Sequence, residues 1–192
     1  MLVTSRHQMK PSFEYSLESA LLGGAALVQL REQELKPAVF SYMAQLVAQL
    51  CRSYNATLLI NGQVEIARSV ADGVHLPEAV LQNERLPEIA CKGVSVHSIE
   101  NARRAAELGA DYVIFGSVFA TSSHPENEPA GLEALHQVAQ AVDIPVFAIG
   151  GISAANAKSC LEAGAHGVAV MSTVWQAADA VQAVRDLREV LE

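Results

Sequence analysis

The sequence predicts a compact (β/α)8 barrel, and three short apolar runs in its second half are the first observation behind this prediction. They occupy residues 111–117, 144–151 and 167–173, and stretches with helical character separate them. A strand buried on both faces of a parallel sheet reads as a continuous β-branched run. Apolar runs that alternate with helices therefore predict repeated βα units.

A weak internal repeat is the second observation. Residues 22–30, 108–115 and 163–170 each contain the end of a helix, then Gly-Ala, then a strand, and residues 70–76 form a shorter variant. Glycine after the last helical turn adopts the left-handed conformation at low cost and lets the chain turn sharply into the next strand. Four such junctions favour a βα repeat over one irregular α/β sheet.

The number of expected elements is the third observation. The expected strands are Leu2–Thr4, Leu27–Leu30, Thr57–Ile60, Gly73–Leu76, Gly93–Val96, Tyr112–Phe115, Val146–Ile149 and Gly167–Val170. The expected helices are Glu14–Leu22, Pro37–Ser53, Val64–Val70, Asn83–Ala90, Ile99–Leu108, Leu132–Val142, Ala154–Ala163 and Trp175–Leu191. Eight βα units in 192 residues require short loops and abbreviated third and fourth helices. An open, doubly wound sheet is the competing architecture, and it usually has fewer strands at this length.

Local signals support several helix starts. Pro37 fits the first position of a helix, where its missing N–H costs nothing, and Ser98 and Ser153 fit N-cap positions. The sequence contains no linker, low-complexity tract or composition shift, so residues 1–192 are expected to form a single domain.

Composition narrows the classes of partner. The formal net charge is −8, which argues against nucleic acid or an anionic membrane surface as the main partner. The chain has no run near the roughly 20 apolar residues of a membrane span, and its first residues lack the basic region of a signal peptide. A cytoplasmic protein that binds a small molecule is expected, and a homo-oligomer is compatible with the sequence.

The spacing of the three cysteines is not typical of a disulfide or zinc-binding pattern. Cys51, Cys91 and Cys160 are far apart, odd in number and without CxxC spacing, so neither a disulfide framework nor a zinc site is predicted.

The last two expected strands end in small residues, which is typical of a phosphate site. Gly150 and Gly151 precede one helix, and Met171 and Ser172 precede another. Barrels frequently hold phosphate between the loops after strands seven and eight, on backbone N–H groups at helix starts. The alternative is that these glycines only make tight turns between strand and helix.

Active-site residues of such barrels lie at the carboxyl ends of strands, and the second strand ends in a polar group. Gln29 and Arg31 share one face of this strand, and Glu32 follows. The Arg31 guanidinium suits an anion because it can donate two parallel hydrogen bonds. Asn61 after the third strand and Ser95 on the fifth would help to shape the pocket.

The histidines differ in their expected roles. His75 could simply pack at the end of the fourth strand, and His97 is expected to make a structural hydrogen bond. His124 lies in the long polar loop 120–130, which also holds Thr121 and Ser123 and follows Ser117. Long loops over a barrel mouth are commonly lids, and an imidazole there can move protons near neutral pH.

These motifs together resemble the thiamine phosphate synthase/TenI family of small (β/α)8 barrels over nearly the whole chain. The matching segments are Val28-Gln-Leu-Arg-Glu32, Leu59-Ile-Asn-Gly62, Asp72-Gly-Val-His-Leu-Pro77, Gly93-Val-Ser-Val-His-Ser98, Ala110-Asp-Tyr-Val-Ile-Phe-Gly116, Ala148-Ile-Gly-Gly-Ile152 and Gly167-Val-Ala-Val-Met-Ser172. The resemblance implies one of two reactions. Synthases join a pyrimidine pyrophosphate to a thiazole phosphate with magnesium, and TenI-type tautomerases shift protons within a thiazole carboxylate phosphate without a metal.

The residues at the charged positions of the family pattern favour the tautomerase. Synthases carry Asn-Asp after the third strand, where this chain has Asn61-Gly62, and Glu78 is at best a displaced substitute for their second aspartate. Their two lysines correspond to Gln33 and His124. The TenI histidine after Phe-Gly is Ser117 here, so this fit is also incomplete.

We therefore expect a metal-independent, TenI-like thiazole tautomerase without a cofactor. In this assignment Glu32 and His124 move protons, Arg31 holds the carboxylate, and Gln29, Asn61, Ser95, Ser117, Thr121 and Ser123 line the substrate. Gly150, Gly151, Met171 and Ser172 would hold the phosphate. The alternatives are a divergent synthase that needs magnesium and a non-catalytic regulator that binds a thiazole phosphate.

Overall fold

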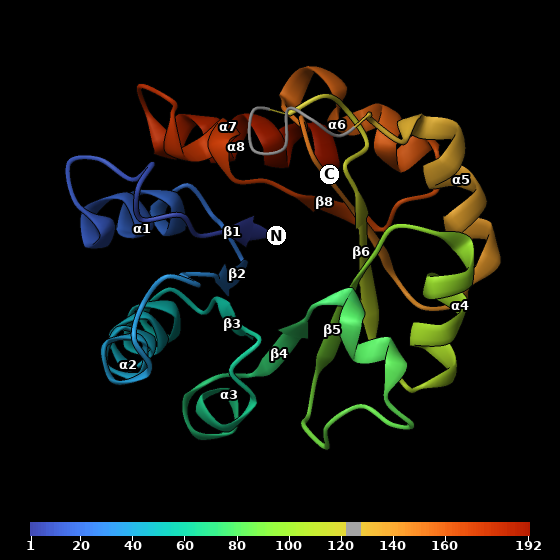
Figure 1. Cartoon of the computed structure of the whole chain (residues 1–192). Helices are drawn as coiled ribbons and strands as arrows, with labels where there is room; N and C mark the ends of the chain where they lie inside the picture. The colour runs from blue at the N-terminus through green and yellow to red at the C-terminus, as the bar shows by residue number, and fades with distance from the viewer. Residues whose placement is uncertain (122–127) are drawn as a thin grey trace. The chain divides into compact units, whose positions relative to one another are not determined.

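The computed structural model describes residues 1–121 and 128–192, and within these residues eight strands alternate with helices along the chain (Figure 1). This order confirms the βα repeat expected from the sequence. The residues divide into two compact units. The first contains 1–74, 171–190 and 192, and the second contains 75–170 and 191.

The first unit holds the first three strands and both ends of the chain. Its elements are β1 (Leu2–Val3), α1 (Phe13–Leu22), β2 (Leu27–Leu30), α2 (Pro37–Ser53), β3 (Thr57–Asn61), α3 (Val64–Val70), the start of β4 (Gly73–Leu76), α7 (Ser172–Trp175) and α8 (Ala180–Leu191). β1 pairs with β2 and β2 with β3, in parallel, with Val28 opposite both Leu2 and Leu58. The buried Trp175 indole donates to the Val3 carbonyl oxygen over 2.7 Å, which fixes α7 to β1.

The second unit holds the later βα units. Its elements are the end of β4, the 3-10 helix η1 (Glu78–Gln82), β5 (Lys92–Val96), α4 (Ile99–Glu107), β6 (Tyr112–Gly116), α5 (Gly131–Ala141), β7 (Val146–Ile149), α6 (Ala154–Glu162) and β8 (Gly167–Ala169). β5, β6, β7 and β8 pair in parallel in sequence order. Every residue of β6 is buried, as expected for a strand inside a parallel sheet.

The repeat detected in the sequence is a repeated turn. Gly24, Gly109 and Gly164 each follow a helix with φ between 82° and 98°. In each case the N–H of the next alanine donates to the carbonyl oxygen five residues earlier, over 2.9–3.1 Å. This is the Schellman arrangement, which satisfies carbonyl groups at the helix end.

A fourth copy of this turn was not predicted from the sequence because it contains no glycine. Asn55 has φ 54°, and the Ala56 N–H donates to the Cys51 carbonyl oxygen over 2.9 Å. Asparagine is one of the few other residues that tolerates this conformation. The shorter variant expected at residues 70–76 differs, because Gly73 is already the first residue of β4 and Ala71 is extended.

Two expected helices are wrong. Residues 83–90 form no helix, and the segment contains Pro87, whose ring disfavours a helical conformation at Leu86 and removes a backbone donor. The expected helix at residues 175–191 is two helices, α7 and α8. Asp179 starts the second by accepting a hydrogen bond from the Gln182 N–H. The expected caps at Ser98 and Ser153 and the first-turn Pro37 are confirmed.

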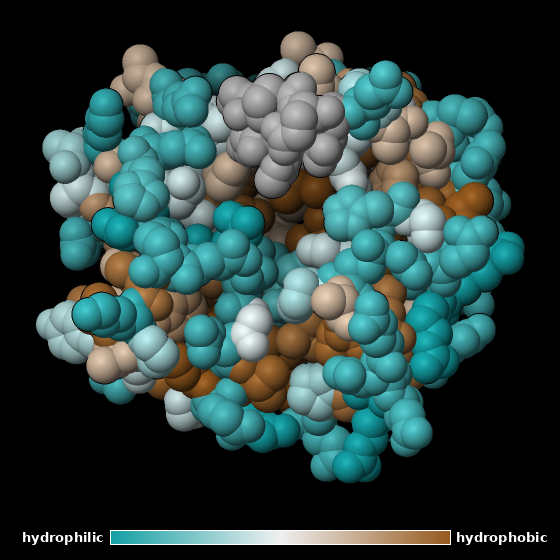
Figure 2. Space-filling model, in the orientation of Figure 1, coloured by the Kyte–Doolittle hydropathy of each residue, from teal (hydrophilic) through white to brown (hydrophobic). Residues whose placement is uncertain are grey.

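The surface of the molecule is mainly hydrophilic in the view of Figure 2. No helix of the described residues has the length and apolar character needed to cross a membrane.

Replacing Gly109 with alanine tests the turn. No heavy atom lies within 4 Å of the position of an added Cβ, so the cost is purely that of placing an L-residue at φ 82°. We expect Gly109→Ala to lower the free energy of unfolding in urea by about 1 kcal/mol. Gly109→Asn is the matched control and should lose less, since Asn55 occupies the same turn elsewhere. Equal stability of the alanine variant and the wild type would contradict this account.

Candidate active site

The end of β2 presents two buried side chains and one half-exposed one. Gln29 and Glu32 are each 2 % exposed, whereas Arg31 is half-exposed. Gln29 projects into the interior of its unit, where its amide nitrogen lies 3.8 Å from the Met1 sulfur. The Arg31 N–H donates to the Thr4 hydroxyl over 3.0 Å, which joins the ends of β1 and β2. In this fold class the active-site residues lie at these carboxyl ends of the strands.

Glu32 makes a buried contact with the backbone. Its two carboxylate oxygens accept from the Arg6 N–H over 3.0 and 3.2 Å, and the Thr4 hydroxyl also donates to it. Burial raises the pKa of Glu32, and the hydrogen bonds from Thr4 and Arg6 only partly oppose this effect. Glu32 is thus a carboxyl group that readily holds a proton, and its role as a proton-transfer group stays a prediction.

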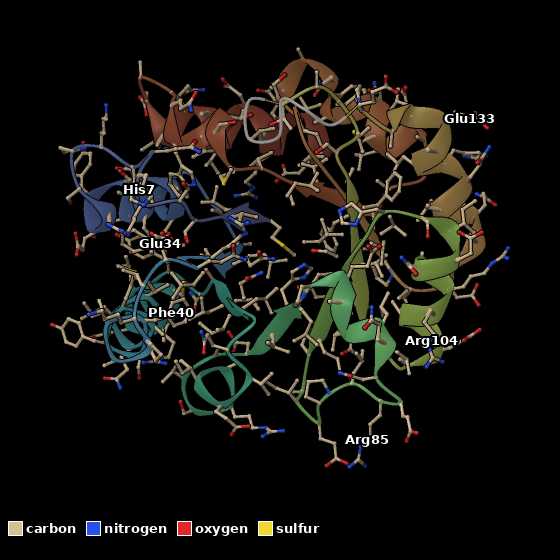
Figure 3. The ribbon with its side chains drawn as sticks, viewed as in Figure 1. His7, Glu34, Phe40, Arg85, Arg104 and Glu133 are labelled. Atoms are coloured by element: carbon tan, nitrogen blue, oxygen red, sulfur yellow. The ribbon has the colours of Figure 1, made fainter. Side chains whose placement is uncertain are left out.

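A salt bridge that the sequence did not predict lies beside this carboxylate. The Arg6 Nε lies 2.6 Å from the Glu34 carboxylate, and the His7 Nε2 lies 3.1 Å from the same oxygen. Figure 3 shows His7 and Glu34 side by side. Partial burial raises the pKa of Glu34, but its hydrogen bonds and the Arg6 charge outweigh this, so the pKa lies below its usual value.

Gln33 brings two of the expected site residues together. An Arg31 guanidinium nitrogen donates to the Gln33 side-chain oxygen over 3.4 Å, and the Gln33 amide donates to the Asn61 side-chain oxygen over 3.4 Å. Gly62 follows at φ 75° with open space around it. The position that carries a lysine in synthases therefore bridges an arginine and an asparagine through neutral hydrogen bonds.

In the second unit, Ser95 is half-buried and lies next to a buried histidine. The His75 Nε2 is 2.8 Å from the Ser95 hydroxyl, and the His75 Nδ1 is 3.0 Å from the Tyr112 hydroxyl. Tyr112 was expected only as a strand residue. It became visible as a polar partner only through its contact with His75, 37 residues away in sequence.

Ser117 lies against the glycines that end β7. A Cβ added at Gly150 would meet Ser117, and one added at Gly151 would meet Phe119 and Ala120. The N–H groups of Val118 and Phe119 donate to the carbonyl oxygens of Ile149 and Gly150, so pairing continues past the end of β6. Close approach of this segment and positive φ values (101° and 63°) both require glycine here.

The backbone donors of these glycines suit an anion as well. Among the described residues, the N–H groups of Gly150 and Gly151 have no acceptor, and α6 follows them with the Ser153–Asn156 capping box. In the first unit, the N–H groups of Met171 and Ser172 likewise have no acceptor among the residues that the structure describes. Backbone N–H groups of this kind can bind an anion in each unit separately, and phosphate binding by these four residues together stays a prediction.

The remaining expected residues lie around the undescribed segment. Thr121 is half-buried and is the last described residue before it. Ser123 and His124 fall within residues 122–127, outside the described residues.

Glu78, the residue that could replace a magnesium ligand of the synthases, is paired with a histidine. Glu78 is bound by His97, since one of its oxygens accepts from the His97 N–H over 2.8 Å and the other lies 3.1 Å from Nδ1. Partial burial raises the pKa of Glu78, but hydrogen bonds from Asn101 and His97 outweigh it and hold the pKa below its usual value. No group of three His, Cys, Asp or Glu suited to a metal occurs among the described residues.

The repeated βα units, with their parallel strands paired in sequence order, define a (β/α)8 protein as the class. The comparisons identify the family within this class. A sequence model of the family described as thiamine monophosphate synthase matches residues 1–174. The chain therefore belongs to the thiamine phosphate synthase/TenI family.

Similar proteins cover nearly the whole chain. A protein of Aquifex aeolicus named putative thiamine-phosphate synthase 2 is 41 % identical over 88 % of this chain and 94 % of its own length. The thiamine-phosphate synthase of Moorella thermoacetica is 41 % identical over 95 % of this chain and 89 % of its own. The solved thiamine phosphate pyrophosphorylase of Pyrococcus furiosus is 35 % identical, covers 99 % of this chain and 93 % of its own, and superimposes with a TM-score of 0.86. The expected (β/α)8 barrel class is thereby confirmed.

The buried carboxyl group of Glu32 predicts a pH-dependent stability. Its pKa in the folded state lies above the ordinary value of 4.5, so its favourable contribution is fully present below pH 4.5 and is lost as pH rises through the raised pKa. We expect the free energy of unfolding of the wild type, relative to Glu32→Gln, to fall as the pH rises above 4.5. Each unit of pKa difference corresponds to about 1.4 kcal/mol.

Urea denaturation at a series of pH values measures this difference. The control is Glu133→Gln, which makes the same exchange on the exposed surface of α5 (Figure 3). A free energy of unfolding of the wild type that instead rises with pH relative to Glu32→Gln would show that the carboxylate is stabilised, not destabilised, by its surroundings.

Proposed function

We propose that this chain is an enzyme of thiamine biosynthesis that binds a thiazole phosphate. Family membership supports the pathway, and the backbone N–H groups of Gly150 and Gly151, which precede α6 and have no acceptor among the described residues, support the phosphate. Anions bind well at such positions because the N–H groups and the helix dipole act together.

The thiamine-phosphate synthase reaction is the first candidate. The observation that carries it is the similarity, over at least nine-tenths of the chain in several cases, to proteins with that name at 36–41 % identity. In this reaction the pyrimidine carbon bonds to the thiazole nitrogen while its bond to pyrophosphate breaks. Arg31 would bind an anionic oxygen of a substrate, and Ser95 would donate a hydrogen bond. The names thus favour this reaction over the isomerase expected from the sequence.

The thiazole tautomerase is the second candidate, and the residues at the charged positions favour it. Gly62 supplies no carboxylate, Glu78 is held by His97, and Gln33 is neutral, so pyrophosphate would leave without the usual neutralising charges. A proton shift needs only a group that accepts a proton and one that delivers it. Glu32, with its raised pKa, and His124 are the groups proposed for these steps.

Two assays on the purified chain separate the candidates. The first incubates it with the pyrimidine pyrophosphate, the thiazole phosphate and magnesium and measures thiamine phosphate and pyrophosphate. The second follows, by NMR in deuterated water, proton exchange in the thiazole carboxylate phosphate. Product in the first assay supports the synthase, and enzyme-dependent exchange in the second supports the tautomerase. Binding of a thiazole phosphate with neither activity would contradict both and leave a non-catalytic binder.

The role of His124 is tested by His124→Asn and His124→Gln. If the chain is a tautomerase in which this imidazole transfers a proton, turnover should fall about 100-fold or more, the usual size of an acid–base contribution. The control is His136→Gln, on the exposed face of α5. Turnover equal to the wild type would remove His124 from the mechanism.

The phosphate site is tested by Gly150→Ala. The added Cβ would press on Ser117 at φ 101° and displace the backbone donors, so affinity for a thiazole phosphate should fall about 10-fold or more by calorimetry. Gly164→Ala is a matched control in the same unit, since φ there is 98° and the residue lies at the end of α6, away from the β7 loop. Unchanged affinity in Gly150→Ala would place the phosphate elsewhere.

A further inference from the structure

Three polar side chains from neighbouring strands of the second unit form one hydrogen-bonded chain. Tyr112 is the first residue of β6, His75 the third of β4 and Ser95 the fourth of β5. The two hydrogen bonds, Tyr112 to His75 and His75 to Ser95, measure 3.0 and 2.8 Å. The chain therefore leads from the start of β6 to near the carboxyl end of β5, where substrates bind in this fold class.

Packing holds the first two members in place. The Tyr112 ring lies over Gly93, where an added Cβ would meet the ring. It also stacks on His75 and makes a T-shaped contact with Phe147. Tyr112 is 5 % exposed and His75 is 2 % exposed. Neither ring can turn without displacing its neighbours, so the packing fixes which atoms the two hydrogen bonds join.

The direction of each proton follows from the chemistry of the groups. Burial raises the pKa of Tyr112, so its hydroxyl keeps its proton, and His75 is its one hydrogen-bond partner among the described residues. The hydroxyl therefore donates to Nδ1. A neutral imidazole that accepts at Nδ1 carries its proton on Nε2, which then donates to the Ser95 oxygen.

Ser95 is left with its own proton to donate. Its hydroxyl oxygen already accepts from His75, and within the described residues it has no other partner. We propose that His75, held by Tyr112, is a positioning residue that turns Ser95 into a hydrogen-bond donor for an anionic oxygen of the substrate. The proposed function supplies only the identity of that substrate, a phosphate ester.

NMR of the whole chain labelled with 15N in its histidine rings tests the proton direction without any ligand. We expect His75, assigned by loss of its signals in His75→Gln, to be in the Nε2–H form. Tyr112→Phe removes the donor to Nδ1 and should convert this single form into a mixture. A wild-type Nδ1–H form, or an unchanged form in Tyr112→Phe, would overturn the proposal.

Binding of inorganic pyrophosphate and of a thiazole phosphate, measured by calorimetry, tests the consequence for Ser95. Ser95→Ala and His75→Leu should each weaken binding of at least one probe about 10-fold, because a hydrogen bond to a charged group is lost. His75→Gln retains an N–H donor that can reach Ser95 and should stay within about 3-fold of the wild type. His136→Gln is the control. Circular dichroism confirms that each variant is folded.

The pattern across the variants separates positioning from packing. Equal weakening in His75→Leu and His75→Gln would mean that His75 only fills space, and no weakening in Ser95→Ala would mean that Ser95 does not meet the ligand. Either result overturns the proposal. The two proposals can fail separately. If neither assay of the proposed function gives product but the Nε2–H form and the binding pattern are observed, the positioning of Ser95 by His75 is confirmed and only the proposed reaction is wrong.

Discussion

The left-handed turn at the ends of the helices is the constraint on which the placement of the strands depends. A helix that ends in this turn delivers the next residue to a fixed position, where its N–H closes on the carbonyl oxygen five residues earlier. The residue before the strand then pairs with the preceding strand. Asp111 does so twice, through its backbone N–H to the Lys92 carbonyl oxygen and through its carboxylate to the Lys92 N–H. Because the turn fixes the position at which each strand starts, it also fixes where the carboxyl end of that strand, with its site residues, lies.

The sequence predicted this architecture well because its signals are local. An apolar run, a glycine after a helix and a capping serine each act within a few residues, so the three glycine turns and the expected caps are confirmed. The errors are also local. Pro87 breaks a segment that otherwise has helical composition, and Asp179 starts a second helix inside what reads as one. Asn55 shows the limit of reading by residue type, since the same turn forms without glycine.

The candidate site was harder to predict, because its contacts join residues that are far apart in sequence. Strand ends located Glu32 and Ser95, but the partners that define their chemistry, the Arg6 N–H and the His75 ring, lie 26 and 20 residues away. Nothing in the sequence marks Tyr112 as a polar partner, since an aromatic residue that begins a buried strand is ordinary core. Its hydroxyl is recognised as a hydrogen-bond partner only because the fold places it next to His75.

The two candidate reactions make different chemical demands on one (β/α)8 scaffold. Expelling pyrophosphate builds up negative charge that cations must neutralise as the bond breaks, whereas moving a proton within a ring leaves the charge of the substrate unchanged. At the described positions that carry such charges in synthases, this chain has one arginine, Arg31, whose neighbours Gln33 and Asn61 are neutral. Similarity over the whole chain reports the shared scaffold, so the names of the relatives and these few side chains bear on separate questions. The backbone donors proposed to hold phosphate at Gly150 and Gly151 would suit either reaction, whereas the charges near Arg31 distinguish the two.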